Sequence, residues 1–539
     1  LAAWSVLGAR FTGQCTSRVE MEATERSMRE ACEAALQEYA KRDAIALAEQ
    51  AEEESAKPPA RKPPKWKKVE PPQFQVTEMV ERANKSVEGD YYGIKFPKDK
   101  EEILQMGPQW LTKAFHTSGV LGQDNAVTHI DDARGFVGGG AGLKCILKVR
   151  YKQDSPHLHK ELFVKLPHKP GGSDRFFVSC MWNHDRPETI FNIWLEPFIP
   201  YKVPKMYFSD ICAETTNFIL ITETIPWSDK GSQDIKPGEI EPAYDKYMDW
   251  ELPDGGPMYY HALCKALGKI AAYHKAGKLH PQVDEMFPMP DINLIRQYFP
   301  PFDVAARKKA NYDIDGLIKF LSQTAKDVFP TDVTDVQWLE QWKSEALHFM
   351  EYGSEVTLFC MGEGTSEPKD YITFTHNNLQ IDNAYFWRRE DGTVEAGLLD
   401  WGVLACQPFA SAVQGCISGA NMEVLLEHRE AFLETAVDSY LLYGGPKLNL
   451  ERMVMMNNLQ LMSWACSIPA NVTQVLKHTK KNEWPEIKDW MDPRLLDRFQ
   501  TRTHCSQFKI ALQLWRKAGL YNRFLEWLKA EGLPLRKQP

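Results

Sequence analysis

The chain has 539 residues, of which 43% are apolar and 25% are charged, and its formal net charge at pH 7 is -9. This composition is typical of a well-packed globular protein and excludes intrinsic disorder as the main state. The acidic balance argues against a nucleic-acid-binding role, because such proteins present many lysines and arginines to the phosphate backbone.

The cysteines and the hydropathy pattern narrow the range of compartments. The 11 cysteines form no C-x-x-C pair and no His/Cys cluster with zinc spacing, so we interpret them as buried residues in a reducing intracellular compartment. No uncharged apolar run approaches the roughly 20 residues that cross a bilayer, which leaves peripheral membrane association open. Because residue 1 is leucine, we expect either that a targeting segment has been removed or that the sequence is truncated, so the cytoplasm and an organelle, a plastid or a mitochondrion, stay open.

The N-terminal region is predicted to contain a helix and a basic linker. A capping-box pattern begins a helix expected over residues 18–54, whose apolar residues form a narrow stripe. Residues 57–72 combine six basic residues and six prolines with Trp66, which predicts an extended segment. An arm that binds an acidic partner and a solvated spacer both remain open. We expect protein partners to contact residues 18–72.

Strand patterns give way to helical periodicity along the rest of the chain. The first part predicts four strands and a helix: strands at residues 125–136, 143–151, 162–166 and 218–225, and a helix at residues 186–195. Helices predominate beyond residue 260, at residues 262–274, 317–328, 336–350, 422–443, 450–462, 506–518 and 521–530. Two short strands are expected around Thr373 and Leu398. The pattern predicts an α+β protein whose parts are residues 1–72, residues 73–225 with a small mixed lobe, and residues 226–539 with a large helical lobe.

The first lobe contains candidate phosphate-binding groups. Gly138, Gly139 and Gly140 lie in a turn between two strands, where backbone N–H groups can approach an anion; a flexible hairpin is the alternative. Lys165 lies within an apolar strand after that turn, which favours phosphate binding over a lysine at a strand edge. Glu188 in the next helix is its expected ion-pair partner, although a solvated helix face explains this residue almost as well.

The last predicted strand of the first lobe reaches Glu223. We interpret the end of this strand as a hinge between the lobes, where backbone groups would contact an adenine. A plain buried strand is the alternative, because recognition by backbone groups leaves no side-chain pattern in the sequence.

The second lobe contains the most informative stretch of the chain. His376, Asn383 and Asp400 have the spacing of a loop-supporting histidine and two Mg²⁺ ligands, which are an amide oxygen and a carboxylate. Phosphoryl transfer depends on such positioning groups more than on covalent chemistry. Because His376, Asn383 and Asp400 all occur at this spacing, loop support and Mg²⁺ binding are favoured over three unrelated polar residues.

Residues 108–462 resemble the aminoglycoside-phosphotransferase and choline-kinase superfamily, and are most similar to its ecdysteroid-kinase-like (CHK-kinase-like) branch. The catalytic loop of that branch reads H-G-D-L-W-x-x-N-x-x-F, and this chain has His376-Asn377-Asn378-Leu379-Gln380-Ile381-Asp382-Asn383-Ala384-Tyr385-Phe386. The resemblance implies a protein-kinase-like fold with a small antiparallel-sheet lobe and a large, mainly helical lobe. It also implies the use of ATP and Mg²⁺ to phosphorylate a hydroxyl of a small molecule.

Asn378 stands where the family has the aspartate that aligns and deprotonates the acceptor hydroxyl. An amide has no basic site near neutral pH, and general-base assistance is worth roughly 10²–10⁴ in rate. We therefore predict a pseudokinase that binds nucleotide and acts as a structural or regulatory subunit of a larger assembly. An active small-molecule kinase, with Asn378 aligning the substrate, and a scaffold without nucleotide are the alternatives. Asp382, the other loop carboxylate, is a less favoured substitute base.

Overall fold

The computed structural model describes residue 61 and residues 63–70, 76–136, 142–171, 175–182, 185–232, 234–253 and 256–536. Arg61–Pro539 forms one compact unit. The helix expected over residues 18–54 lies outside the described residues. Within the part of the chain that is described, no helix combines the length and the apolar character needed to cross a membrane.

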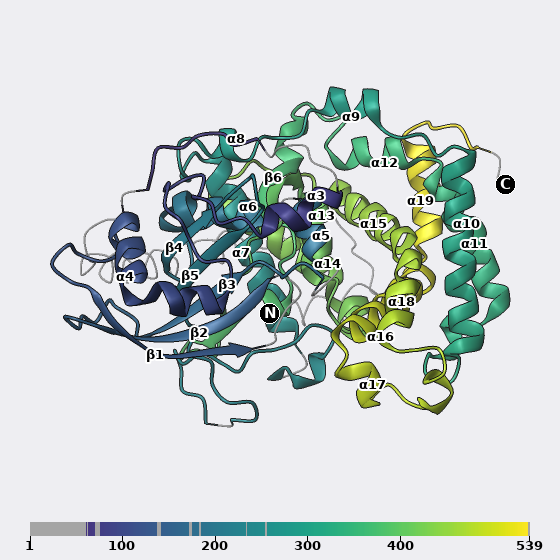
Figure 1. Ribbon diagram of the computed structural model, residues 1–539. Helices are drawn as coiled ribbons and strands as arrows, with labels where there is room; N and C mark the ends of the chain where they lie inside the picture. The colour runs from purple at the N-terminus through teal and green to yellow at the C-terminus, as the bar shows by residue number, and fades with distance from the viewer. Residues whose placement is uncertain are drawn as a thin grey trace. The chain divides into compact units, whose positions relative to one another are not determined.

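A five-stranded antiparallel sheet forms the first lobe (Figure 1). Its strands are β1 (Val127–Phe136), β2 (Leu143–Tyr151), β3 (Glu161–Leu166), β4 (Met206–Ile211) and β5 (Phe218–Glu223), in the order β1-β2-β3-β5-β4. This confirms four predicted strands. The sequence did not predict β4, because the buried polar residues Ser209 and Asp210 interrupt the apolar run of this short strand.

Helix α4 (Lys100–Ser118) packs against this sheet, after the short helix α3 (Val76–Ala83). It is interrupted at Gly107, whose φ of +67° is in the left-handed region, and Pro108 begins the second helical piece. The buried side chains of α4 and the sheet form one apolar cluster, which includes Trp110, Leu111, Phe115, Leu147, Val164 and Ile221. The opposite face of the sheet, with Phe218 and Leu220, joins the core of the second lobe.

Two helices occupy the connection between β3 and β4. They are α5 (Arg175–Trp182) and α6 (Asp185–Ile190), and α6 continues as one π-helical turn, η1 (Phe191–Leu195), before the short turn η2 (Glu196–Phe198). This confirms the helix predicted at residues 186–195, but the π turn left no signal in the sequence. Helix α6 contacts β4 and β5 of the first lobe and also β9 (Leu404–Pro408) of the second lobe, so it lies between the two lobes.

The second lobe is mainly helical (Figure 1). Its helices are α7 (Pro257–Lys275), α8 (Val283–Met286), α9 (Ile292–Tyr298), α10 (Val304–Lys319), α11 (Val336–Met350), α12 (Gly353–Cys360), α13 (Phe409–Ile417), α14 (Met422–Leu442), α15 (Leu450–Ser467), α16 (Val472–His478), α17 (Pro493–Leu496), α18 (Phe499–Lys517) and α19 (Leu520–Ala530). Six predicted helices are confirmed as α7, α11, α14, α15, α18 and α19. The helix predicted at residues 317–328 was wrong in its bounds. Asp303 caps α10 much earlier, and the exposed side chains of Val304 and Tyr312 hide the apolar period at the start of this helix.

Two short antiparallel sheets hold the catalytic-loop region. β6 (Ile372–His376) pairs with β9 (Leu404–Pro408), and β7 (Ala384–Arg388) pairs with β8 (Val394–Leu398). β6 and β8 confirm the strands expected around Thr373 and Leu398, whereas β7 and β9 were not predicted. Residues 377–383 therefore form the connection from β6 to β7, and Asp400 follows β8 directly.

Helices α7 and α14 approach each other closely at Gly268. A Cβ atom at this position would lie 2.3 Å from the carbonyl oxygen of Ala436 and 2.8 Å from the Cβ of Ser439. We expect Gly268→Ala to lower the free energy of unfolding by about 1–3 kcal/mol, because the helices must separate. Urea denaturation measures this loss. The control is Gly316→Ala in α10, where an added Cβ meets nothing within 4 Å and should stabilise the helix by up to about 1 kcal/mol. Equal stability of the two variants would contradict the prediction.

Candidate functional site

The buried amine of Lys165 joins β3 to two other elements. Its Nζ lies 2.6 Å from Oε2 of Glu188 on α6 and 3.0 Å from Oδ1 of Asp400, which follows β8. The side chains of Lys165 and Glu188 are only 3% and 7% exposed, so each charge depends on its partner. The expected ion pair between Lys165 and Glu188 is therefore present, and Asp400 is a second partner that the sequence did not predict.

These contacts keep Lys165 and Asp400 charged. Burial acts to lower the pKa of Lys165, but the carboxylates of Asp400 and Glu188 outweigh it and raise that pKa above its ordinary value. Burial acts to raise the pKa of Asp400, and the positive charge of Lys165 outweighs it, so that this pKa falls to about 2. Because the side chain of Asp400 remains 33% exposed, its carboxylate can still reach a cation.

The backbone of Asp400 has an uncommon conformation. Its φ of +62° lies in the left-handed region, which costs a residue other than glycine about 1–3 kcal/mol. The next residue, Trp401, stacks on Phe191 of η1 with ring centroids 3.8 Å apart and also contacts the ring of His376 at 4.7 Å. This apolar stack holds the segment that carries Asp400 against the helix that carries Glu188.

His376 links the loop to the segment before Asp400. Its Nε2 lies 2.9 Å from the carbonyl oxygen of Leu399, and its Nδ1 lies 3.3 Å from the backbone nitrogen of Asn378. Both bonds form if Nε2–H donates and Nδ1 accepts, which requires a neutral ring. Burial lowers the pKa of His376, in agreement with that neutral form. The histidine therefore occupies the loop-supporting position that its spacing predicted.

Asn383 and Asn377 hold the two ends of the loop. Nδ2 of Asn383 donates to the carbonyl oxygen of Asn378 at 2.7 Å, which leaves its amide oxygen as the atom that could bind a metal. Nδ2 of Asn377 donates to the carbonyl oxygen of Val403 at 2.9 Å. The loop is thus fastened to β7 and to the segment before β9 by side chains other than that of Asn378.

The carboxylate of Asp382 is engaged in an ion pair. Its Oδ2 lies 3.2 Å from Nζ of Lys246, and the same amine donates to Oε1 of Gln380 at 2.9 Å. Using Asp382 as a base would require this pair to break. This ion pair agrees with the prediction that Asp382 is a less favoured substitute for the aspartate that Asn378 replaces.

Glu223 uses its carboxylate within the protein. Oε1 accepts from the backbone nitrogen of Lys205 at 3.1 Å, and Oε2 lies 2.9 Å from Nε2 of His159. The backbone N–H of Glu223 also donates to the carbonyl oxygen of Lys205, at 2.9 Å. A cofactor role for Glu223 would therefore depend on its carbonyl oxygen, and it stays a prediction. Gly138, Gly139 and Gly140 lie outside the described residues.

The face of the sheet that carries Lys165 also carries an apolar row that sequence reasoning missed. Phe163 in β3 pairs with Ile146 in β2 and with Thr222 in β5. Side chains two residues apart on a strand share a face, so these residues lie beside Lys165. The ring of Phe136 in β1 lies 6.0 Å from that of Phe163. Only the strand register places these residues together, which is why the linear pattern did not reveal them.

The topology and the contacts of Lys165 now allow comparison with known proteins. The fold is kinase-like. No protein-family model and no curated protein matches the chain. Among solved structures, a choline kinase from Cryptosporidium parvum is 12% identical, covering 80% of this chain and 100% of its own, with a TM-score of 0.39. An ethanolamine kinase from Plasmodium vivax is 11% identical, with coverages of 70% and 84% and a TM-score of 0.32. An aminoglycoside 2'-phosphotransferase, solved with GDP, is 10% identical, with coverages of 71% and 93% and a TM-score of 0.34.

At these identities and TM-scores the three matches carry no argument about activity or substrate. The narrower CHK-kinase-like branch stays a prediction. The kinase-like fold itself rests on the five-stranded antiparallel sheet, the helical second lobe and the Lys165–Glu188 pair described above.

Part of the predicted linker packs on the kinase-like unit. The ring of Trp66 meets that of Trp194 edge-on at 5.1 Å and stacks on Tyr91 at 6.1 Å. Nε1 of Trp194 donates to the carbonyl oxygen of Pro64 at 2.9 Å. No helix or strand is present at residues 61 and 63–70, as expected for an extended segment.

A polar contact strengthens this docking. Arg61 donates to the carbonyl oxygen of Asn192 at 3.1 Å and pairs with the carboxylate of Glu196. Asn192 in turn donates its side-chain amide to the carbonyl oxygen of Glu188 at 2.8 Å. The segment therefore braces the helix that carries Glu188, and Trp66 is an anchor within this chain.

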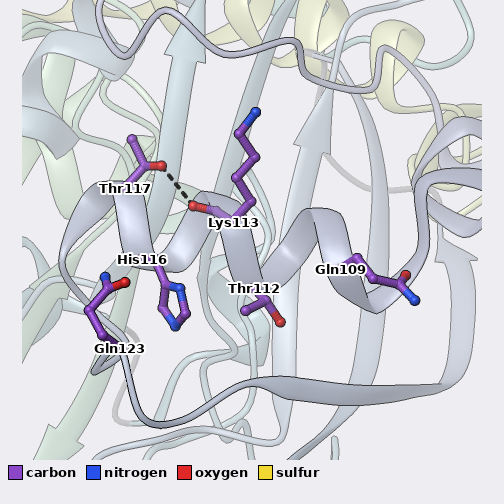
Figure 2. A pocket seen from close by; sticks show the side chains of 6 residues that line it. All are labelled: Gln109, Thr112, Lys113, His116, Thr117 and Gln123. Atoms are coloured by element: carbon purple, nitrogen blue, oxygen red, sulfur yellow. Dashed lines mark hydrogen bonds between the residues drawn. The ribbon is translucent and has the colours of Figure 1, made fainter.

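A hollow of about 420 Å³ lies elsewhere on the first lobe, along α4 (Figure 2). Gln109, Thr112, Lys113, His116, Thr117 and Gln123 line it. Thr117 donates to the carbonyl oxygen of Lys113 at 2.7 Å, and Nε2 of His116 lies 2.8 Å from the carbonyl oxygen of Asn125. None of its lining residues belongs to the group around Lys165, so the hollow is separate from the candidate site.

The buried ion pair predicts a large coupling energy between Lys165 and Glu188. We expect Lys165→Met to lower the free energy of unfolding by about 3–5 kcal/mol, because buried carboxylates lose their cation. Adding Glu188→Gln should then cost much less than it does alone. Urea denaturation of the single and double variants gives the coupling. The control is Lys169→Met, whose amine is 55% exposed and should contribute less than about 1 kcal/mol. Similar losses at Lys165 and Lys169 would refute this account.

The packing of Trp66 predicts that the linker segment containing this residue stabilises the kinase-like unit. Trp66→Ala should lower the free energy of unfolding by about 1–3 kcal/mol, the range for losing two aromatic contacts. Trp250→Ala serves as the matched control, because the Trp250 side chain is 44% exposed. Chemical denaturation followed by circular dichroism measures both variants. If Trp66→Ala is no less stable than Trp250→Ala, the segment does not brace the unit.

Proposed function

We propose that the protein is a pseudokinase that binds a magnesium nucleotide but transfers phosphate poorly. One observation carries the proposal. Lys165 and Glu188 form a buried ion pair that the partly exposed carboxylate of Asp400 joins, whereas an amide side chain, that of Asn378, stands at the position of the catalytic base. The protein then serves as a structural or regulatory subunit of a larger assembly.

The residues at the site suit Mg²⁺ and ATP. Mg²⁺ prefers hard oxygen ligands, and the carboxylate of Asp400 and the amide oxygen of Asn383 supply two of them. Lys165 would bind phosphate oxygens, and the row that contains Phe163 offers an apolar surface to an adenine. Bound Mg²⁺ would neutralise charge on the phosphates.

The environment of Asn378 supports weak transfer. The loop holds this residue through its backbone, by bonds to His376 and Asn383. Its side-chain amide could hold a hydroxyl by a hydrogen bond but could not take the proton near neutral pH. Losing general-base assistance would slow transfer by roughly 10²–10⁴.

An active kinase for a small hydroxyl compound is the second candidate. It is favoured by the intact contacts of Lys165, since positioning and electrostatics supply most of the acceleration in phosphoryl transfer. In that case Asn378 would align the acceptor, and another group or water would take its proton.

We also propose that protein partners bind residues 18–72. Because Trp66 packs within the kinase-like unit, partner contacts in the described part of this segment would fall on exposed lysines, namely Lys65, Lys67 and Lys68. Their charge suits an acidic surface. We place the protein in a reducing intracellular compartment, cytoplasmic or organellar.

Thermal unfolding with Mg-ATP tests nucleotide binding. A ligand at about 100 times its Kd should stabilise the folded state by about 2.7 kcal/mol. Asp400→Asn should remove the Mg²⁺-dependent part of this shift, and Asp234→Asn, a change at an exposed aspartate, should leave it intact. If the wild type shows no shift with millimolar nucleotide, the scaffold alternative stands and nucleotide binding is wrong.

A phosphorylation assay separates the pseudokinase from the active kinase. We expect slow turnover of hydroxyl-bearing metabolites by the wild type and a roughly 10²–10⁴-fold gain in Asn378→Asp, because the carboxylate restores a base. Asp400→Asn in the same background is the negative control. Robust wild-type turnover with little gain in Asn378→Asp would overturn the pseudokinase proposal.

A further inference from the structure

A second lysine stands directly opposite Lys165 in the sheet. The register of β2 and β3 pairs Lys144 with Lys165, and that of β1 and β2 pairs Phe136 with Lys144. Residues that are direct cross-strand partners project from the same face of a sheet. Lys144 and Lys165 therefore share the face that also carries Phe163.

Like charges at such a position normally destabilise a sheet. The next lysine on the same face of β2 shows the ordinary arrangement, because Lys148 has Glu161 as its partner on β3 and Asp132 as its partner on β1. The register instead pairs Lys144 with Phe136 on β1 and with Lys165 on β3. The sheet thus places two cations side by side where an acid would be expected.

Lys144 is also largely withdrawn from water. Its Nζ donates to the carbonyl oxygen of Gly142, at the end of the β1–β2 turn, at 3.2 Å. Burial and then the charge of Lys165 lower the pKa of Lys144 to about 8, and Asp400, Glu188 and Asp185 oppose this only in part. An anion bound beside Lys144 and Lys165 would offset the repulsion between these two like charges.

We propose that Lys144 is a second phosphate-binding lysine, so that a nucleoside di- or triphosphate binds between two cross-strand amines. The inference rests on the proposed nucleotide binding and names its ligand class. The polyphosphate would lie along the row of Lys144 and Lys165, and the base would lie along the neighbouring row of Ile146, Phe163 and Thr222. A nucleoside offers the two amines no anion, and a monophosphate offers them less negative charge than a longer phosphate chain does.

Binding of ATP, ADP, AMP and adenosine to the full chain tests this assignment by calorimetry. Lys144→Met should weaken binding of ATP and ADP by roughly 10- to 100-fold, as expected for one charge-assisted hydrogen bond, and should change adenosine binding little. Lys144→Arg should retain most of the affinity. Lys148→Met is the matched control on the same strand and face, and it should bind like the wild type.

Stability without ligand provides a second measurement. Because Lys144→Met removes a like-charge contact, its melting temperature should equal or exceed that of the wild type. A lower melting temperature together with equal losses for ATP and adenosine would mean a purely structural role and would overturn the proposal. Unchanged ATP affinity in Lys144→Met would overturn it as well.

Inorganic tripolyphosphate separates this inference from the proposed function. If the wild type binds tripolyphosphate but not ATP, and Lys144→Met weakens that binding, the two-lysine anion site stands although nucleotide binding fails. If ATP binds and Lys144→Met has no effect, the proposed function stands and the inference fails. If neither compound binds, both fail.

Discussion

The pairing of the buried Lys165 ammonium is the constraint on which the rest of the site depends. Removing an ion from water costs several kcal/mol unless a partner of opposite charge replaces the solvent. Here the partners lie 23 and 235 residues further along the chain, on α6 and after β8. The sheet, helix α6 and the segment that carries Asp400 must therefore all be in contact for Lys165 to be paired. Displacing Glu188 or Asp400 would leave charge buried without its partner.

Apolar contacts make this electrostatic arrangement rigid. The stack of Phe191, Trp401 and His376 fastens the helix of Glu188 to the segment of Asp400 and offsets the left-handed backbone of that aspartate. Trp66 packs on Trp194, in the π turn that continues the same helix. The helix therefore contacts both the second lobe and the linker. This preorganisation favours ligand binding, because little ordering remains when the ligand arrives.

The loop around Asn378 keeps its shape without an aspartate. Its backbone is bonded to His376 and Asn383, and the side chain of Asn377 fastens it to the strand that follows Asp400. None of these bonds uses the side chain at position 378. A change there can therefore alter proton transfer while the candidate phosphate and metal groups stay in place. The proposed binding of a nucleotide without efficient transfer requires this separation.

The local sequence pattern was sufficient to predict the elements in which buried and exposed residues alternate with the period of a strand or a helix, such as β2 and α11. It was also sufficient to identify the loop motif from His376 to Asn383. It was insufficient for β4, in which buried polar residues interrupt the apolar run, and for the π turn after α6, which has no local signal. The sequence alone determined that Asn378 lacks a basic side chain. Only the tertiary structure placed Asp400 on Lys165, Lys144 opposite Lys165 and Trp66 on Trp194. These contacts depend on strand register and on the approach of segments far apart in the chain, which no local pattern encodes.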